Sequence, residues 1–415
     1  MSSEWISTTI GQLITLQRGH DLPAQDRVKG NVPIMGSAGI TGYHDRATTK
    51  GPGVVVGRSG VGSMGVVSYI CRDYWALNTT LFVKDFKGND ERFIYYLLKT
   101  VNFRQFDTGS AQASLNRNVV YPHKVSIPSS LEEQRRISKV LVAIEDRITL
   151  LRETNTTLEG IALALFKSWF VDFDPVRAKA DGREPEGLDE STARFFPDAF
   201  EESDLGLVPK GWQVMPIGDA VDAVGGATPD TKNPEFWSPS VHCWTSPKDL
   251  SGAAAPVLLD TERKVSDAGL ARIGSGLLPV GTLLLSSRAP IGYLSLAQVP
   301  LAINQGYIAM LPGGLLPPLF LLFWCRQNMD QIKGRANGST FLEISKKAFR
   351  PIPTLVPTQN LIEAFMGVAT SLFSRLIENE KQALSLTALR DTLLPRLISG
   401  QLRLSTPEPL GEFAA

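Results

Sequence analysis

The sequence predicts an α+β fold in which a strand-rich block followed by a long helix occurs twice. The first observation is an internal repeat, because Trp5 to Gly11 and Trp212 to Gly218 match at an offset of 207 residues. The second is a heptad pattern of apolar residues after each block. The third is a series of short β-branched runs and glycine-rich turns inside each block.

Further matches between the two blocks keep the same order along the chain. A single match of this kind arises easily by chance, whereas an ordered series indicates a duplicated block. The matches are Arg58 with Arg288 at an offset of 230, Ala76–Asn78 with Ala302–Asn304 at 226, and Gly109-Ser110 with Gly338-Ser339 and Pro128 with Pro357 at 229.

Each block is predicted to contain an antiparallel hairpin. Two apolar, largely β-branched runs at 54–56 and 66–70 flank a glycine-rich turn, and the corresponding runs in the second block lie at 283–285 and 293–296. A short helix is predicted after each hairpin, from Phe93 and from Leu319.

The clearest local pattern is a long helix that begins after Pro128. Ser130 and Glu133 form a capping box. The positions that follow are spaced alternately by four and three residues, which is typical of a coiled-coil seam. About 38 residues at about 1.5 Å each give roughly 57 Å, longer than a small domain is wide. The seam consists of Ile137, Leu141, Ile144, Ile148, Leu151, Asn155, Leu158, Ala162, Leu165 and Trp169.

A second seam follows the second block. Asn155 is the one polar member of the first seam, and a single buried asparagine can fix the register of paired helices. Two long helices with matching seams can pack on each other as a coiled coil. The second seam contains Ile362, Met366, Ala369, Phe373 and Leu376 and continues less regularly to Leu393.

These patterns divide the chain into six parts. The net charge of zero hides an alternation, because residues 1–128 and 205–354 carry +5 and +3 while the segments after them carry −7 and −1. Phosphate binding needs local positive charge, not a basic whole chain. The predicted parts are 1–128 for the first block, 129–173 for the first long helix, 174–209 for an acidic linker, 210–357 for the second block, 358–402 for the second long helix and 403–415 for a tail.

The composition, with 43% apolar and 20% charged residues, is that of a globular protein. The first residues lack the basic and apolar regions of a signal peptide, and no apolar run is long enough to cross a bilayer. The cysteines Cys71, Cys243 and Cys325 have no paired spacing. Neither a disulfide framework nor a zinc site is therefore expected.

Three motifs of catalytic proteins occur without the context that each requires. Gly60–Gly65 fits GxGxxG, but a β-branched run follows where a nucleotide site needs a helix. Asp230 with Glu262–Lys264 imitates a nuclease pattern, which needs carboxylates on adjacent strands to hold Mg²⁺. Asn233–Phe236 resembles the Asn-Pro-Pro-aromatic loop of amino-methyltransferases, with Glu235 in place of the second proline. A stand-alone nuclease or methyltransferase stays the alternative function, and a scaffold that does not bind DNA is a third.

Longer stretches resemble the specificity subunits of type I restriction-modification systems. The segment from Phe170 to Trp212 is similar to their central segment, and Lys264–Gly292 is similar to their second target-recognition domain. Leu393–Leu402 resembles the end of their C-terminal helix. The resemblance covers essentially the whole chain. It implies that each block is a target-recognition domain for one half of a split DNA site, and that the two helices form an antiparallel coiled-coil spacer.

The resemblance also implies partners and a place of action. The partners would be double-stranded DNA, two methyltransferase (modification) subunits docked on the spacer seams, and motor-nuclease (restriction) subunits. The protein would act in the cytoplasm of a bacterium or archaeon, with no membrane contact. No cofactor or metal is expected on this chain, and S-adenosylmethionine, ATP and Mg²⁺ are expected on the partner subunits.

Base readout needs polar side chains at loop tips that can reach the edges of a DNA groove. For each candidate the alternative is an ordinary turn or cap residue. Residues common to both blocks favour phosphate contact, because the blocks would read different bases; Arg58 and Arg288 are predicted to bind phosphate on this ground. The candidates are Arg58, Ser59, Asn78, Ser110, Gln112, Ser114, Asn116 and Arg117 in the first block, and Ser287, Arg288, Asn304, Gln305, Asn337, Ser339, Thr340, Ser345 and Lys346 in the second.

Overall fold

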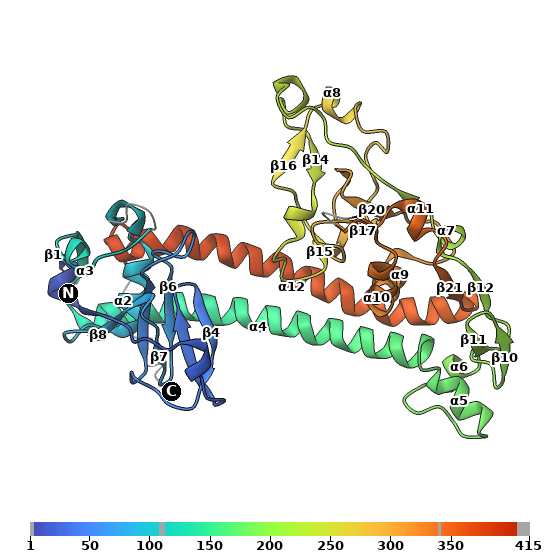
Figure 1. Cartoon of the computed structure of the whole chain (residues 1–415), viewed down its shortest axis with the longest axis horizontal. Coiled ribbons are helices and arrows are strands. Elements are labelled where there is room, and N and C mark those ends of the chain that lie inside the picture. The colour runs from blue at the N-terminus through green and yellow to red at the C-terminus, as the bar shows by residue number, and fades with distance from the viewer. Residues whose placement is uncertain (1–3, 108–112, 339–341, 405–415) are drawn as a thin grey trace, which may run out of the picture. The chain divides into compact units, whose positions relative to one another are not determined.

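A computed structural model describes residues 4–107, 113–338 and 342–404 (Figure 1). The chain divides into two compact units. The first unit comprises residues 1–148 together with 384–415, and the second unit comprises residues 149–383. Each unit contains one strand-rich block and a part of each long helix.

The block of the first unit is closed by its own first and last strands, β1 (Trp5–Thr9) and β9 (Lys124–Pro128), which pair antiparallel. Between them lie a four-stranded sheet in the order β2-β8-β5-β6 and a three-stranded sheet in the order β4-β3-β7. The other elements are α1 (Ile10–Leu13), β2 (Thr15–Arg18), β3 (Val32–Gly36), β4 (Gly39–His44), β5 (Gly53–Gly57), β6 (Val67–Ile70), β7 (Trp75–Ala76), β8 (Thr80–Asp85), α2 (Glu91–Lys99) and α3 (Arg117–Val120), with single 3-10 turns at Ala24–Asp26 and Phe103–Phe106.

The block of the second unit is likewise closed by an antiparallel pair, β12 (Gln213–Pro216) with β21 (Pro353–Val356). Its sheets have the orders β13-β20-β17-β18-β15 and β16-β14-β19. The other elements are α7 (Ile217–Ala220), β13 (Ala223–Val224), β14 (His242–Thr245), β15 (Val257–Leu258), β16 (Arg263–Val265), α8 (Asp267–Leu270), β17 (Leu283–Ser286), β18 (Leu294–Ala297), β19 (Leu301–Ile303), β20 (Tyr307–Met310), α9 (Pro318–Gln327), α10 (Met329–Gly334) and α11 (Lys346–Phe349), with 3-10 turns at Pro234–Phe236 and Pro247–Leu250.

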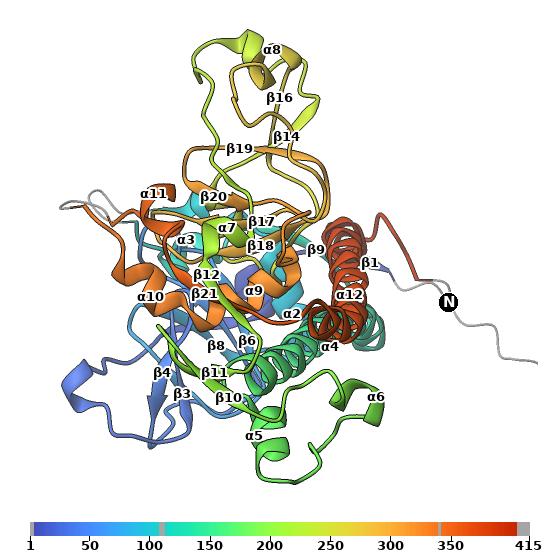
Figure 2. The same ribbon diagram turned by 90° about the vertical axis from the view of Figure 1, so that its right-hand side faces the viewer.

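The predicted duplication is confirmed by the topology of these sheets. The order β13-β20-β17-β18 repeats β2-β8-β5-β6, with β15 added at the edge of the second copy. In both three-stranded sheets the central strand pairs antiparallel with one neighbour and parallel with the other. Within the second unit, the three-stranded sheet stands on the far side of the five-stranded sheet from the long helices (Figure 2).

Main-chain hydrogen bonds correct the sequence match between Arg58 and Arg288. The N–H of Arg58 donates to the carbonyl of Thr79, and the N–H of Ser287 donates to that of Gly306, each at 2.8 Å. Ser287 is therefore the counterpart of Arg58, and Arg288 is the counterpart of Ser59. The match by sequence was therefore one residue out. The turn after the strand is two residues shorter in the second unit, so the two arginines could be aligned although they occupy different positions in the fold.

A second match is corrected in the same way. The N–H of Leu77 donates to the carbonyl of Met35 at 2.9 Å, and the N–H of Asn304 donates to that of Thr245 at 3.0 Å. Asn304 is therefore the counterpart of Leu77. It follows that the counterpart of Asn78 is the next residue, Gln305.

The glycine-rich motif Gly60–Gly65 forms the turn between β5 and β6, which pair antiparallel. The Gly65 N–H donates to the carbonyl of Gly57 at 2.8 Å and so closes this turn. Gly65 has φ +82°, and a Cβ there would come within 2.6 Å of the Phe103 side chain. The glycine therefore serves a tight hairpin packed against its own block, as the following β-branched run predicts.

The two predicted long helices are α4 (Leu131–Phe170) and α12 (Gln359–Ser399). In the second unit, Asn155 of α4 lies beside Leu376 of α12, and Phe166 lies beside Phe365. The numbers rise along one helix as they fall along the other, so the helices run antiparallel. In the first unit, the α4 residues Ile137 and Leu141 share a core with the end of α12.

Burial along the helices follows the predicted seams for most of their length. The side chains of Ile137, Leu141, Ile148, Leu151, Asn155, Ala162 and Trp169 in α4 and of Ile362, Ala369, Phe373 and Leu376 in α12 are buried. Four predicted seam members are only half-buried, namely Ile144, Leu158, Leu165 and Met366. An α-helix drifts relative to a strict heptad, and towards the end of α4 the neighbouring Phe166 and Phe170 are buried instead.

The polar seam residue Asn155 has a partner that the sequence pattern missed. Its Oδ1 accepts a hydrogen bond from Asn379 Nδ2 at 3.0 Å, and its Nδ2 donates to the Leu376 carbonyl at 3.2 Å. Both asparagine side chains are 2% exposed. The two amides meet these partners only when α4 and α12 are in this one register, so the pair fixes the register of the two helices.

Replacement of one asparagine is expected to cost more than replacement of both. Asn155→Ala leaves the buried Asn379 amide without its partner and should lower the free energy of unfolding by about 1–3 kcal/mol. Asn155→Leu with Asn379→Leu removes both polar groups and should restore stability to within about 1 kcal/mol of the parent. Urea unfolding of the three proteins measures this difference. A double variant less stable than Asn155→Ala would contradict it.

The segment 174–209, predicted as an acidic linker, folds onto the second unit. It contains α5 (Asp174–Ala180), α6 (Glu190–Ala193) and the hairpin of β10 (Phe200–Ser203) with β11 (Gly206–Pro209), all near the end of α4 (Figure 1). The ring of Phe196 packs edge-on against Trp169 at 5.1 Å between centroids. The segment therefore contributes apolar side chains to the core of that unit.

Candidate nucleic-acid interface

In the first unit, two predicted residues meet at the end of the four-stranded sheet. Arg58 follows β5 and Asn78 precedes β8, the strand that pairs with β5. The Arg58 Nη1 donates to the Asn78 carbonyl at 3.4 Å, and Arg18 Nε donates to the same carbonyl at 3.3 Å. Two guanidinium groups thus lie together at this sheet end, and Arg18 was not a candidate from sequence.

The neighbouring candidates of the first unit line the same region. Ser59 forms an isolated β-bridge with Ser114, and the Leu115 N–H donates to the Arg58 carbonyl at 2.8 Å. Asn116 caps α3 through its side chain, which is the structural alternative considered for it. The exposed Arg117 donates from Nη1 to the Leu16 carbonyl at 3.1 Å. Ser110 and Gln112, and in the second unit Ser339 and Thr340, lie outside the described residues.

The corresponding region of the second unit uses different side chains. Ser287, the counterpart of Arg58, is 2% exposed and does not offer its hydroxyl to solvent. Arg288 is partly exposed and its Nη1 lies 3.4 Å from Glu343 Oε2. Exposed Asn337 exchanges main-chain hydrogen bonds with Glu343 at 3.0 Å each way. This end of the second unit therefore carries a mixed rather than a purely cationic surface.

Four more candidates belong to the second unit. The Asn304 side chain accepts from the Gly306 N–H at 2.8 Å and so shapes its own turn. The exposed Gln305 side chain accepts from the Thr228 hydroxyl at 2.7 Å. Ser345 caps α11, and the next residue, Lys346, is exposed.

Lys346 supplies a positive charge where the first unit has Arg18, although the two residues occupy different positions in their blocks. Gly225 is the counterpart of Arg18, because each comes directly after the residue that pairs with the equivalent position of β8 or β20, Gln17 with Phe82 and Val224 with Ala309. A Cβ at Gly225 would lie 3.3 Å from the Lys346 Nζ. The ammonium group of Lys346 therefore occupies the space in which the Arg18 side chain begins in the first unit.

The residues of the nuclease-like motif serve local contacts. Asp230 accepts a hydrogen bond from the Lys232 N–H at 2.9 Å, and Lys264 Nζ lies 3.3 Å from Asp260 Oδ1. Glu262 lies 3.9 Å from the Lys248 ammonium. Across the described ranges no group of three or more His, Cys, Asp or Glu side chains is placed to hold a metal ion.

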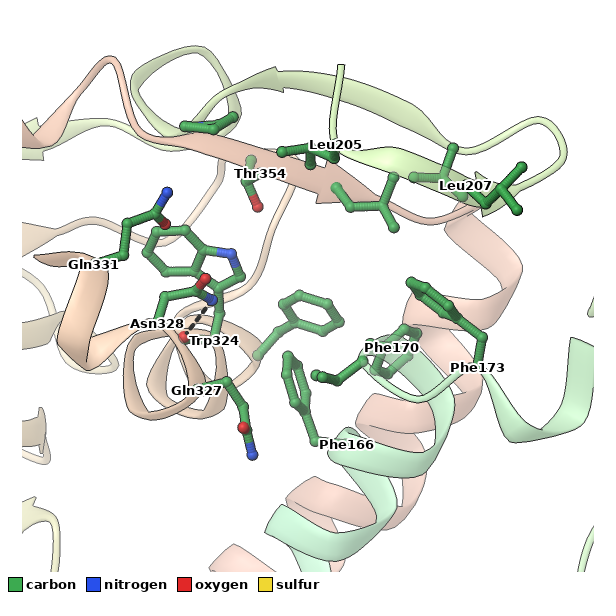
Figure 3. Close-up of a pocket in the computed structure, with 15 residues that line it drawn as sticks. Phe166, Phe170, Phe173, Leu205, Leu207, Trp324, Gln327, Asn328, Gln331 and Thr354 are labelled. Carbon is green, nitrogen blue, oxygen red and sulfur yellow. Dashed lines mark hydrogen bonds between the residues drawn. The ribbon is translucent and has the colours of Figure 1, made fainter. Parts of the chain in front are cut away.

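The second unit also contains an apolar hollow of about 290 Å³ beside the hairpin β10–β11 (Figure 3). Phe166 and Phe170 from α4, Trp324 from α9 and Leu207 from the hairpin point toward it. Its polar lining consists of amide and hydroxyl side chains, those of Gln327, Asn328, Gln331 and Thr354. The lining side chains supply apolar surface and hydrogen bonds, and none of them titrates near neutral pH.

None of the described helices is long and apolar enough to cross a membrane. Cys71, Cys243 and Cys325 are free thiols in this structure. Cys325 is completely buried in the second unit, and burial raises the pKa of its thiol. Cys243 donates to Asp260 Oδ1 at 3.4 Å, and its neighbour His242 contacts Asp267 at 2.6 Å.

Comparison with known proteins identifies relatives of one kind. The family model for the type I restriction modification DNA specificity domain matches residues 2–160 and 209–386. The HindI specificity subunit of Haemophilus influenzae is 30% identical over 319 residues, which cover 67% of this chain and 69% of that protein. The MjaIX specificity subunit of Methanocaldococcus jannaschii is 35% identical over 187 residues, or 44% of this chain and 42% of that protein.

A solved structure has the same fold. The crystal structure of a type I restriction-modification S subunit from M. genitalium superposes with a TM-score of 0.61 at 18% identity, covering 95% of this chain and 96% of that one. The duplicated block, the paired long helices and the family match over both halves agree with one another. The chain belongs to the family of type I restriction-modification specificity subunits, which are the DNA-recognition and non-catalytic components of those systems.

Proposed function

We propose that this chain reads a bipartite DNA site, one half with each strand-rich block, and that it docks modification and restriction subunits. The observation that carries the proposal is the duplication, in which two blocks of one topology present different side chains at equivalent places. Ser59 and Arg288 are such a pair, as are Asn78 and Gln305. Equivalent frames with different polar side chains suit two different half-sites.

Partner docking is assigned to the long helices. Leu150 and Ile161 of α4 are 52% and 49% exposed, and Thr154 and Thr157 lie between them on the same face. Residues spaced by four, three and four positions form one stripe on a helix. This uncharged stripe in the second unit suits contact with helices of another subunit. S-adenosylmethionine, ATP and Mg²⁺ belong on those partner subunits under this proposal.

Exchange of one block tests the bipartite reading. Residues 210–357 are enclosed by the pair β12–β21, whose strands lie side by side, so the block can be replaced by that of a relative at one place in the fold. The hybrid, expressed with modification subunits, should methylate a site changed in one half only. Methylome sequencing of the host measures this. A site altered in both halves, or in neither, would be incompatible with one half-site per block.

A further inference from the structure

The corrected register makes Asn78 and Gln305 structural counterparts, and both carry a carboxamide. Asn78 lies just before β8, the strand that pairs with β5, and Gln305 lies just before β20, the strand that pairs with β17. Gln305 is exposed and Asn78 is partly exposed. Both amides thus stand at the equivalent sheet end of their units.

Each of these amides is held by a side chain from the segment that runs beside it. The Asn78 Nδ2 donates to the carboxylate of Asp21, and the Thr228 hydroxyl donates to Gln305 Oε1. Asp21 and Thr228 are themselves counterparts, because the preceding residues His20 and Ala227 bond to the equivalent carbonyls of Ala76 and Ile303. Both blocks therefore hold an anchored carboxamide at this place. It is an asparagine anchored by an aspartate in the first block and a glutamine anchored by a threonine in the second.

The anchoring bonds leave each amide at least one free donor and one free acceptor. Asn78 keeps its Oδ1 and one N–H, and Gln305 keeps its N–H₂ and a lone pair of Oε1, with no other side-chain partner for either amide among the described residues. One acceptor beside one donor is the arrangement that reads the N6 amino group and N7 of adenine in the major groove. An amide fixed by its anchor loses less rotamer freedom when it binds a base.

Cationic side chains lie at the same sheet end as each amide, although they come from different positions. In the first unit Arg18 and Arg58 both donate to the main-chain carbonyl of Asn78 itself. In the second unit Lys346 lies beside Gly225, and Arg288 lines one hollow together with Asn304, the neighbour of Gln305. Phosphate contacts position a protein on DNA, while base contacts specify the sequence.

We propose that Asn78 and Gln305 are specificity-determining residues, each of which reads one adenine in the half-site of its own block. This inference rests on the proposed function. The side chains differ by one methylene group and the anchors differ in charge, so the two amides reach to different depths and orientations. Asp21 and Thr228 are positioning residues that set those orientations.

The test uses the complete methyltransferase, assembled from this chain and its modification subunits. The methylome of a host gives the parent site, and binding is then measured to that site and to every single base-pair variant of it. Asn78→Ala should remove discrimination at one A·T pair of one half-site, and Gln305→Ala at one A·T pair of the other half. The expected loss is about 5- to 140-fold, the equivalent of about 1–3 kcal/mol.

The anchor and control variants separate base reading from a merely structural role. Asp21→Ala and Thr228→Ala should weaken discrimination at the same base pair as the amide that each one holds, and at no other. Gln331→Ala, an exposed amide on α10, is the matched control and should leave the site unchanged. If the amide variants weaken all sequences equally, alter a G·C position or alter no position, while the parent protein still methylates its bipartite site, this inference alone is overturned. If the parent assembly recognises no bipartite site, the proposed function is overturned with it.

Discussion

Phe365→Ala is expected to destabilise the second unit by about 3–5 kcal/mol, because a buried aromatic side chain is lost and the cavity refills only partly. Phe365 is completely buried, and its ring centroid lies 5.3 Å from that of Phe170 and 5.6 Å from that of Phe166. Its other ring neighbours are Trp169 of α4 and Phe320 and Phe323 of α9. Phe365 thus lies in the aromatic cluster where α12 packs against both α4 and α9, the helix that supports the five-stranded sheet.

The measurement is urea unfolding followed by tryptophan fluorescence, which reports mainly on the second unit, where five of the seven tryptophans lie. Val368→Ala is the matched control, since Val368 lies one turn further along α12 and is 45% exposed. The control should change the free energy of unfolding by less than about 0.5 kcal/mol. A loss below about 1 kcal/mol for Phe365→Ala would show that the aromatic cluster is not what joins the helices.

Leu150→Asp combined with Ile161→Asp is expected to abolish assembly with the modification subunits while this chain stays folded. Both side chains are about half exposed, so the carboxylates remain hydrated in the free protein. In the docked complex they would be buried without partners, at a cost of several kcal/mol each. Co-purification of tagged modification subunits measures assembly, and circular dichroism of the free variant measures its fold.

Leu207→Asp provides the control for this second experiment. Leu207 is 65% exposed, but it lies on the hairpin β10–β11 and not on a long helix. The control should assemble as the parent does. Recovery of a complete complex with the double variant would exclude the uncharged stripe of α4 as the docking face.

The duplicated topology could be predicted from the sequence because it leaves ordered matches, but its register could not. Arg58 was aligned with Arg288 on letter identity, whereas main-chain hydrogen bonds set the true correspondence with Ser287. The burial of Ser287 could not be predicted either, since a serine next to an arginine in a turn is expected to be exposed. Register depends on turn length, and turn length differs between the units.

The helix seam was predicted for most of its length, including the polar Asn155 of α4, but the polar seam residues of α12 were missed. Asn379 and Glu380 of α12 are buried, at 2% and 8% exposure, yet no hydropathy pattern selects them. The anchors Asp21 and Thr228 were missed for a related reason. Their importance comes from side chains far along the chain, at Asn78 and Gln305, and local sequence carries no trace of such pairing.

The division of the first unit between both ends of the chain has a consequence for its synthesis. Ile137 and Leu141 share their core with Leu394, Leu397 and Ile398, and the Trp5 indole N–H donates to the Ile398 carbonyl at 3.1 Å. About 250 residues separate the two sides of this core, which a ribosome adds in about 10–50 s at roughly 5–20 residues per second. During that interval the nascent chain carries an uncovered apolar ridge, so the block that emerges first is the last to be completed.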